Sequence, residues 1–408
     1  DLFIKRNRIK GLCPHCAALA LFCLQTNAPA GGAGIRTGLR GGGPLTTLLV
    51  SQHPACLWRD LWLNICERDK FLGRAGDPGK KEPHFTFPWL AEIDGIQAVS
   101  GQTAPIQVHP FHIFWAMPRR IRLDMENLVP GDCDLCGRPS PGLIRRFFTR
   151  PRGLNYKGAW RHPLSPYYEN KGEWLAMHPQ PGGIGYRHWL PWVLGVNARS
   201  RNIQPARVLS YRTSPPDSRL WAFGFDMDNM KARCWYEATL PLYGLSDCDE
   251  DACRRLQAQV EYWLAGADLA VFFLRTAVKN AWFDEARGDF SMVDASFWSR
   301  TETDFYAQLK TLIEELAVNR EAELDASMQA IRIDWHKKLV SACLDLFDNV
   351  FVGTGRIDRQ NPRRIAQAYQ QLKRSLDGRK IRQAVGRPLP ETPVGKRGAK
   401  KSAEIATS

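Results

Sequence analysis

The chain has 408 residues, 44% of them hydrophobic, which is enough for about two or three domains with packed cores. Its net charge of +14 favours a polyanionic partner such as nucleic acid, although a basic enzyme would show the same balance. The most apolar run, Leu264–Val278, carries Asp268 and Arg275, and neither a signal peptide nor a small secreted disulfide framework is recognisable, so we expect a cytoplasmic protein without a membrane span.

The first part of the chain, residues 1–244, is irregular. Proline, glycine and tryptophan are frequent there and the apolar runs are short, as in Leu45–Val50 and Leu220–Phe225. This pattern predicts a mixed α/β domain with many loops, within an α+β fold class. Near its start, Cys16–Gln25 (CAALALFCLQ) has the composition of a helix.

A glycine-rich stretch follows this helix. Asn27–Thr47 (NAPAGGAGIRTGLRGGGPLTT) holds seven glycines in 21 residues. It has no G-x-x-x-x-G-K-[ST] sequence, and its candidate G-x-G-x-x-G ends in Thr37 after a predicted helix, so a nucleotide-binding loop is not expected. Glycine also lets backbone approach a ligand closely, as in the minor groove of DNA, where Arg36 and Arg40 could contact phosphates. Tight turns in a loop-rich fold explain the glycines equally well.

Two C-x-x-C pairs predict a metal site. Their cysteines are Cys13, Cys16, Cys133 and Cys136. Two thiolate pairs make a tetrahedral zinc site that is structural, because four protein ligands leave no open position for water. The alternative is four ordinary cysteines. His15, inside the first pair, is not expected to be a ligand.

A basic run interleaved with aromatic residues follows the second pair. The basic residues are Arg138, Arg145, Arg146, Arg150, Arg152, Lys157 and Arg161, and the aromatic ones are Phe147, Phe148, Tyr156 and Trp160. This interleaving is typical of a nucleic-acid surface. A solvated loop would explain the charges alone.

One pair of carboxylates is a second candidate for metal binding. Asp226 and Asp228 (DMD) could hold a metal as in some transferases. No third acidic partner is evident, and the NMK sequence that follows favours a turn.

Four amphipathic segments follow residue 244, and together they predict a four-helix bundle over residues 245–380. Their apolar stripes span Leu256–Val278, Phe305–Leu316, Leu324–Leu346 and Ile365–Leu376. The second helix should begin at a capping box formed by Thr301 and Asp304.

The fourth helix should be capped by Asn361 and end at Gly378. The remaining residues, 381–408, are basic and poor in hydrophobic residues, and we expect a disordered tail that could touch a phosphate backbone.

Taken in order, several blocks resemble one known family. They are LCPHCAALALFCLQTNAPAGGAGIRTGLRGGGPLTTLL, CDLCG, HPLSP and GFDMDNMKARCW, ahead of the four amphipathic segments. The combination is similar to the CasA family, the large subunit of the type I-E CRISPR Cascade complex. The resemblance runs from about Leu2 to Gly378. Family members carry a further N-terminal portion, so this chain is expected to be truncated.

The resemblance implies a non-catalytic subunit that acts with other Cascade subunits and crRNA. Such a subunit recognises the PAM, the short motif beside a target, in double-stranded DNA. It promotes duplex opening, holds the displaced strand and helps recruit a helicase-nuclease. The four cysteines match the family's zinc ligands.

The family's PAM-contacting residues transfer by position. Its minor-groove glycine loop falls on Ala30, Gly31, Gly32, Ala33 and Gly34. The two alanines replace glycines of the usual pattern, so the preferred PAM is expected to differ. A minor-groove lysine falls on Pro151, which cannot act in its place, so Arg150 or Arg152 is expected to do so.

Two further elements transfer as well. The family's wedge, a turn inserted beside the first base pair to open, falls on Asp228, Asn229 and Met230, and Met230 could insert between bases. A loop that contacts neighbouring subunits and guide RNA falls on Leu2–Arg6. The alternatives to this whole interpretation are a metal-dependent enzyme using Asp226 and Asp228, or a purely architectural zinc protein.

Overall fold

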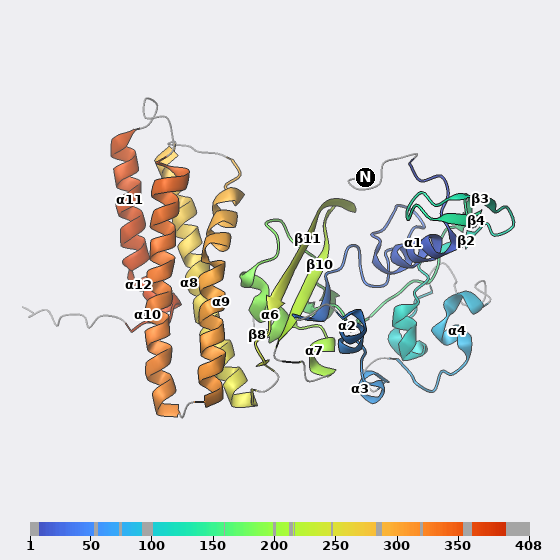
Figure 1. The fold of residues 1–408 in the computed structure, drawn as a ribbon, viewed down its shortest axis with the longest axis horizontal. Coiled ribbons are helices and arrows are strands. Elements are labelled where there is room, and N and C mark those ends of the chain that lie inside the picture. Colours follow the sequence, from blue (N-terminus) through green and yellow to red (C-terminus); the bar gives the residue numbers. More distant parts are fainter. Residues whose placement is uncertain are drawn as a thin grey trace, which may run out of the picture. The chain divides into compact units, whose positions relative to one another are not determined.

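The structure is a computed structural model that describes most of the chain. The described residues are 8–52, 56–72, 76–91, 101–158, 160–198, 201–211, 215, 217–245, 248–282, 288–318, 321–353 and 361–388. Their contacts divide the chain into two compact units. Figure 1 shows the helices and strands, coloured along the sequence. The first unit comprises Asp1–Glu261 with Asp289–Leu324, and the second comprises Tyr262–Gly288 with Asp325–Ser408.

The first unit begins with helix α1 (Pro14–Asn27), which confirms the predicted helix. Pro14 occupies the first helical turn, where its missing N–H has no partner to lose. The helix ends before Ala28, whose backbone is extended and leads into the glycine-rich stretch. The cysteine pair at the start of α1 and the glycines after it are therefore held by one rigid element.

In the described part of the first unit, the paired strands are all antiparallel and form four small sheets. The sheet orders are β1-β10-β11, β2-β5, β3-β4 and β7-β6-β9-β8. The strands are β1 (Thr46–Ser51), β2 (Arg120–Leu123), β3 (Val129–Asp132), β4 (Pro139–Leu143), β5 (Phe147–Arg150), β6 (Tyr167–Asn170), β7 (Glu173–Ala176), β8 (Val196–Ala198), β9 (Arg201–Gln204), β10 (Ser218–Asp228) and β11 (Lys231–Pro241). Short antiparallel strands with many loops agree with the predicted mixed α/β composition.

The longest hairpin, β10-β11, is held by an alternating pattern of burial. Every second residue of β10 from Ser218 to Asp226 is buried, and Leu220 is completely inaccessible, as is Leu49 of the neighbouring strand β1. Period-two burial fixes the register of a strand, because a slip by one residue would expose its whole apolar face. The buried face of β10 therefore fixes the position of the turn at the end of this hairpin.

Short helices connect these sheets. The α-helices are α2 (Leu57–Leu63), α3 (Arg68–Leu72), α4 (Pro83–Thr86), α6 (Trp189–Val193) and α7 (Val208–Tyr211). The 3₁₀ turns are Pro88–Leu90, Pro105–Gln107, Pro110–Phe114 and Tyr186–His188. No helix among the described residues combines the length and the apolar character that a membrane crossing requires.

All four predicted amphipathic segments are helical. The helices are α8 (Glu250–Trp282), α9 (Ser291–Val318), α10 (Glu321–Asp345), which continues into a π-helical turn (Leu346–Phe351), and α11 (Pro362–Asp377), followed by α12 (Arg379–Ala384). By their contacts, α9 belongs to the first unit, α11 and α12 belong to the second, and α8 and α10 contribute to both, with α10 in the second unit from Asp325 onward. The structure thus confirms a helical C-terminal region, while a single four-helix bundle and the domain limits at residues 244 and 380 stay predictions.

The expected start of α9 is wrong. The helix begins at Ser291, whose backbone N–H and hydroxyl both donate to the Asp289 carboxylate at 2.8 Å. Thr301 lies in mid-helix, fully buried, and its hydroxyl donates to the carbonyl of Phe297 at 2.8 Å. A Thr-x-x-Asp spacing fits a capping box, but a threonine hydroxyl can equally donate to a carbonyl of the preceding turn. The Tyr186 hydroxyl, which donates to the Thr301 hydroxyl at 2.9 Å, favours that second arrangement.

In the second unit, the predicted ends of α11 are confirmed. The Asn361 side chain accepts a hydrogen bond from the backbone N–H of Arg364 at 3.2 Å, and Gly378 follows the last residue of the helix. The expected tail from residue 381 begins as folded chain, because Ile381 and Val385 are completely buried. Residues 389–408 lie outside the described part.

Candidate nucleic-acid interface and metal centre

The glycine-rich stretch contains a small exposed loop, Gly31–Ile35. Gly31 donates its backbone N–H to the carbonyl of Ile35 at 3.0 Å, and Ile35 donates to the carbonyl of Gly32 at 3.1 Å. Gly32 and Gly34 have φ of +105° and +77°, which side chains rarely tolerate. Ala30 is half-buried at the base of the loop, whereas Gly31, Gly32 and Ala33 are exposed at its tip.

Each glycine of this loop has its own reason. A Cβ on Gly31 would lie 2.8 Å from Cγ2 of Ile35, and one on Gly34 would lie 2.7 Å from Cβ of Pro151. A Cβ on Gly32 would meet nothing within 4 Å. Gly32 is thus required only by its backbone conformation, and the space beside it is open to a ligand.

The Arg150–Arg152 segment lies directly against the loop. The backbone N–H of Arg152 donates to the carbonyl of Gly34 at 2.8 Å, and Pro151 packs on the bare face of Gly34. Arg150 ends strand β5, and Arg152 takes a φ of +63°. The structure therefore brings together two predicted DNA-binding segments that are far apart in the sequence.

Further arginines surround this junction. Arg36 donates to the carbonyl of Gly153 at 2.5 Å across 117 positions of sequence, and Arg119 donates to the carbonyls of Arg36, at 3.1 Å, and of Pro29. Arg120 donates to the carbonyl of Pro151 at 2.8 Å. Burial and the neighbouring charge of Arg152 lower the pKa of Arg36, and burial lowers that of Arg119.

Arg119 and Arg120 are residues of this region that the sequence patterns did not single out. Two adjacent arginines after Pro118 were the only signal in the sequence that could have pointed to them. No pattern in the neighbouring sequence predicts that these arginines lie beside a loop around residue 34. Arg119 binds the carbonyls of Pro29 and Arg36, which flank the loop on either side, and Arg120 binds the carbonyl of Pro151 in the neighbouring segment.

The second half of the glycine stretch has a packing role. A Cβ on Gly38 would lie 2.7 Å from backbone atoms of Thr26, and one on Gly42 would lie 2.8 Å from Pro29. Gly43 packs against Met227 of β10. The tight-turn explanation therefore holds for this half, and the exposed loop is the part left for a ligand.

Asp228, Asn229 and Met230 form the end of the β10-β11 hairpin. Asn229 and Met230 connect the strands with φ of +45° and +67°, as in a type I′ turn. Met230 is 59% exposed. An apolar side chain that projects from a tight hairpin has the shape of a wedge.

The carboxylates of Asp226 and Asp228 both lie close to the guanidinium of one arginine. Arg233 binds buried Asp226 at 2.7 Å and lies 3.8 Å from Asp228. This hydrogen bond to Asp226 raises the pKa of Arg233. Both aspartates thus have a cationic partner, and within the described residues no third ligand joins them in a metal-binding group.

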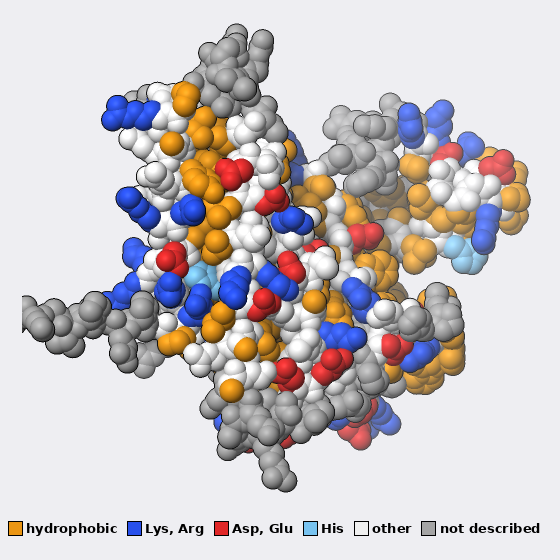
Figure 2. Space-filling view, turned by 60° about the vertical axis from the view of Figure 1, so that its left-hand side comes forward, with side chains coloured by type: hydrophobic (Ala, Val, Ile, Leu, Met, Phe, Trp, Pro, Cys, Tyr) orange, Lys and Arg blue, Asp and Glu red, His pale blue; other side chains and the backbone are white. Residues whose placement is uncertain are grey.

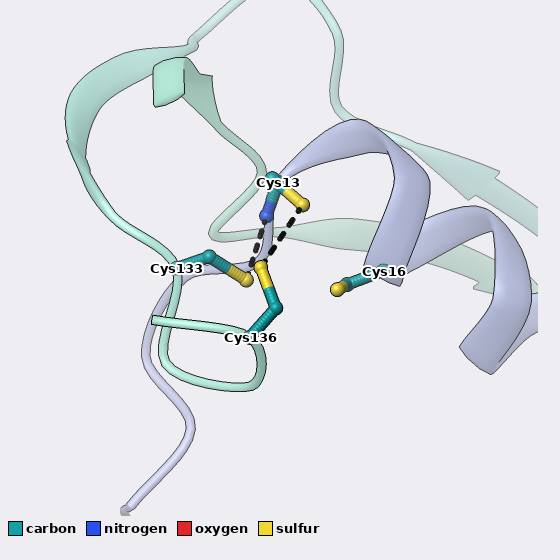
Figure 3. Close-up of side chains that lie close together, drawn as sticks. All are labelled: Cys13, Cys16, Cys133 and Cys136. Atoms are coloured by element: carbon teal, nitrogen blue, oxygen red, sulfur yellow. Dashed lines mark hydrogen bonds between the residues drawn. The ribbon is translucent and has the colours of Figure 1, made fainter. Parts of the chain in front are cut away.

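The four predicted cysteines meet in one cluster (Figure 3), with their Sγ atoms within 4.8 Å of one another. Cys13 and Cys16 come from the start of α1, and Cys133 and Cys136 come from the turn between β3 and β4. The Sγ atoms of Cys13 and Cys136 are 3.9 Å apart. His15 is exposed and outside the cluster.

The geometry and the electrostatics of the cluster suit a soft cation. Four sulfurs about 2.3 Å from a tetrahedral metal stand about 3.8 Å apart, close to the distance between Cys13 and Cys136. Backbone N–H groups of Cys13 and Cys136 lower the pKa of Cys133 to about 6, whereas a hydrogen bond to the Cys13 side chain and burial raise the pKa of Cys16 to about 12. Four neighbouring thiols resist full ionisation because their negative charges repel one another, and a bound cation would offset that repulsion.

The aromatic residues of the basic run divide into two groups. Phe147 and Phe148 are 62% and 51% exposed, and Arg122 lies over the ring of Phe148 at 5.0 Å. Tyr156 and Trp160 pack with the core cluster around Phe71 and Ile113. Only the first pair is available to a partner on the surface of β5.

Over residues 1–346 the chain matches the family model described as CRISPR-associated protein Cse1. The chain belongs to the Cse1 family. Three solved structures show the same fold. For CasA from Thermus thermophilus the identity is 17% and the TM-score 0.57, with 92% of this chain and 74% of that chain covered. For Cse1 from Acidimicrobium ferrooxidans the identity is 16% and the TM-score 0.53, with 92% of this chain and 73% of that chain covered. For Cse1 from Thermobifida fusca the identity is 12% and the TM-score 0.57, with 94% of this chain and 73% of that chain covered.

Family membership confirms the resemblance to CasA and makes this chain a large subunit of the type I-E Cascade complex. The segment Leu2–Arg6, expected to contact neighbouring subunits, lies outside the described residues. On the face of this Cse1 chain seen in Figure 2, Lys and Arg side chains are scattered among acidic and neutral ones. The excess positive charge thus forms no continuous patch among the described residues on that face.

Proposed function

We propose that this Cse1-family chain recognises the PAM in double-stranded DNA for a crRNA-guided Cascade complex. The supporting observation is the exposed Gly31–Ile35 loop, whose tip has open space beside Gly32 and whose base contacts Arg152. The minor groove is about 6 Å wide, so a loop whose tip carries no side chain larger than the methyl group of Ala33 can approach the base edges.

The arginines beside the loop supply the other half of recognition. Arg150 and Arg152 take the role of the family's minor-groove lysine or bind the phosphates that flank the groove. Minor-groove contacts distinguish few sequences, because A·T and T·A pairs present the same acceptors. This suffices here, since base pairing with the guide reads the remaining sequence.

The β10-β11 turn then acts on the first base pair beside the PAM. Met230 inserts between bases, while Asn229 and Asp228 form the rest of the wedge. The charge pair between Arg233 and Asp226 supports the turn from below. In this proposal the chain also holds the displaced strand and helps to recruit the helicase-nuclease.

Zinc is the metal we assign to the four-cysteine cluster. Cys13, Cys16, Cys133 and Cys136 fill all four positions of a tetrahedral ion, so its role is structural. A closed thiolate site fastens α1 to the β3-β4 turn. It thereby stabilises both ends of the region that carries the loop and the arginines.

A binding selection tests the function. The crRNA complex is reconstituted with and without this chain, and each form is incubated with duplexes randomised beside the protospacer. Bound DNA is separated by gel shift and sequenced. We expect enrichment of particular flanking bases only with the chain present. Equal enrichment in both samples would assign PAM recognition to another subunit, and binding without enrichment would reduce this chain to an architectural role.

A further inference from the structure

A cavity of about 490 Å³ opens at the base of the proposed DNA loop. Ala30 and Arg36, which bracket the exposed glycines, both line it. Its other walls come from the β6-β7 hairpin, through Tyr168 and Trp174, and from the chain around Lys157. All of these residues belong to the first unit. A strand held by the loop would therefore pass the mouth of the cavity.

The lining of the cavity is cationic. It includes Arg36, Arg40 and Lys157, and among the described residues that line it there is no aspartate or glutamate. Volumes of a few hundred Å³ are typical of small-molecule sites. A site with three cations and no carboxylate selects an anion.

Arg40 is the most unusual of these cations. It is only 8% exposed, and its Nη2 donates to the hydroxyls of Thr46 at 2.9 Å and Ser165 at 2.8 Å. Its Nε atom is buried without a hydrogen-bond partner, and no carboxylate of the described residues pairs with it. Burial lowers its pKa to about 10, so it keeps its charge at neutral pH. A buried cation without an anion is costly, and an anionic ligand would offset that cost.

The remaining wall is aromatic. Tyr168 and Trp174 are half-buried and reach the cavity from the hairpin, and Arg161 lies over the ring of Trp174 at 4.2 Å. Trp160 and Tyr156 close the cavity from the core side. Aromatic rings beside cations are the combination with which proteins bind single-stranded nucleic acid, through base stacking and phosphate contact.

We propose that this cavity binds one unpaired nucleotide, with its base against Trp174 and Tyr168 and its phosphate near Lys157 and Arg40. The inference rests on the proposed DNA recognition, because the loop brings a strand to the cavity. The nucleotide site adds to that recognition a second DNA contact, which does not depend on the PAM sequence. A DNA strand and an RNA strand share this chemistry.

The first experiment uses the unmodified 408-residue chain. Short oligothymidylate and oligouridylate of equal length, each with one photoreactive 5-iodouracil, are crosslinked, and the labelled peptide is identified by mass spectrometry. We expect crosslinks within Tyr167–Ala176, and the stronger of the two probes identifies the sugar. Inorganic phosphate and thymidine, added separately as competitors, should each act more weakly than thymidine monophosphate. Crosslinks confined to other segments would overturn the proposal.

The second experiment compares two variants with equal charge change. Lys157→Glu alters the exposed cation at the cavity, and Lys171→Glu alters an exposed lysine at the tip of the same β6-β7 hairpin, outside the lining. Oligothymidylate affinity should fall on the order of tenfold for Lys157→Glu and stay near wild type for Lys171→Glu. Equal losses in both variants would mean general charge attraction and would refute the site.

The two proposals fail separately. Crosslinking in the hairpin together with an unenriched PAM library would keep the nucleotide site and remove PAM recognition. An enriched PAM library together with crosslinks outside the hairpin would keep PAM recognition and refute the nucleotide site.

Discussion

Gly32 is the residue whose side chain would stand in the proposed groove-binding position. Gly32→Leu places a side chain where no protein atom lies within 4 Å, so the cost within the fold is backbone strain at φ +105°, about 1–2 kcal/mol. We expect PAM-dependent duplex binding by the complex to fall more than about tenfold, because the added side chain fills the groove-facing space. Gel-shift titration measures this.

The matched control for that prediction is Gly172→Leu. Gly172 has φ +82° and also has nothing within 4 Å of its missing Cβ, but it lies in the β6-β7 turn. Both variants should melt at similar temperatures, and the control should bind DNA normally. Unchanged duplex affinity for Gly32→Leu would refute the loop assignment.

Met230 carries the second prediction at this scale. Met230→Ala should reduce opening of the first base pair, read as a smaller rise in 2-aminopurine fluorescence beside the PAM, while initial duplex capture persists. Because Met230 is 59% exposed, the free energy of unfolding should change by less than about 0.5 kcal/mol. Met292→Ala, at a 73% exposed methionine of α9, is the control. Equal opening by all three proteins would contradict the wedge.

Single residues also show what the sequence could predict. The four cysteines are confirmed as a cluster, and they could be predicted because each C-x-x-C pair is a local pattern and two such pairs make up one tetrahedral ligand set. The contact of Arg152 with Gly34 is not local, and neither is the position of Arg119 behind the loop. Pro151 illustrates the difference: sequence counting marked it as a misplaced lysine position, and the structure gives it a packing role against Gly34.

At the scale of elements, the cysteine cluster joins α1 to the β3-β4 turn. The Asp134 carboxylate reinforces this joint by accepting backbone N–H groups of Lys10 at 2.6 Å and Gly11 at 2.7 Å. The joint is therefore partly formed without metal. Loss of the metal should loosen α1 rather than unfold the whole chain.

Cys133→Ser tests this joint. We expect loss of one zinc per chain by elemental analysis and a fall in melting temperature, since structural zinc contributes on the order of 10 kcal/mol in small domains. Hydrogen exchange should accelerate in α1 first. Cys23→Ser, at an exposed cysteine of the same helix, should change none of these. Full zinc content in Cys133→Ser would exclude this ligand set.

The long helices were predictable because their apolar residues recur with a helical period over many turns. The first residues of these helices were less predictable. Asn361 caps α11 as expected, whereas the Thr301–Asp304 capping-box pattern lies inside α9. The short strands were not predicted one by one, because proline and glycine interrupt them and their partners lie far along the chain. Strand β3, for example, is only VPGD.

At the scale of the molecule, buried histidines set the response to acid. His112, His162 and His336 are each 6% exposed or less. Burial is the main cause that lowers their pKa values, to about 4 for His112 and below the usual value for the other two. All three are therefore neutral in the folded state at pH 7.

The sign of the pH dependence follows from these shifts. In the unfolded chain these histidines bind protons near pH 6.5, and in the folded chain they do so only at lower pH. Stability is therefore complete above about pH 6.5 and falls as the pH drops below it, by up to about 1.4 kcal/mol per histidine and pH unit. Urea unfolding at pH 7 and pH 5 measures this. A free energy of unfolding that rises toward pH 5 would contradict it.

The contact between Gly34 and the Arg150–Arg152 segment has a consequence for anyone who wants to retarget this subunit. The carbonyl of Gly34 and the face on which Pro151 rests are shared by both segments, so the loop cannot be redesigned alone. Most members of a library that varies only Ala30–Gly34 would carry a side chain at position 34, where a Cβ lies 2.7 Å from Cβ of Pro151. Libraries that vary both segments together would relieve that clash, and they suit a search for new preferences in the proposed PAM recognition.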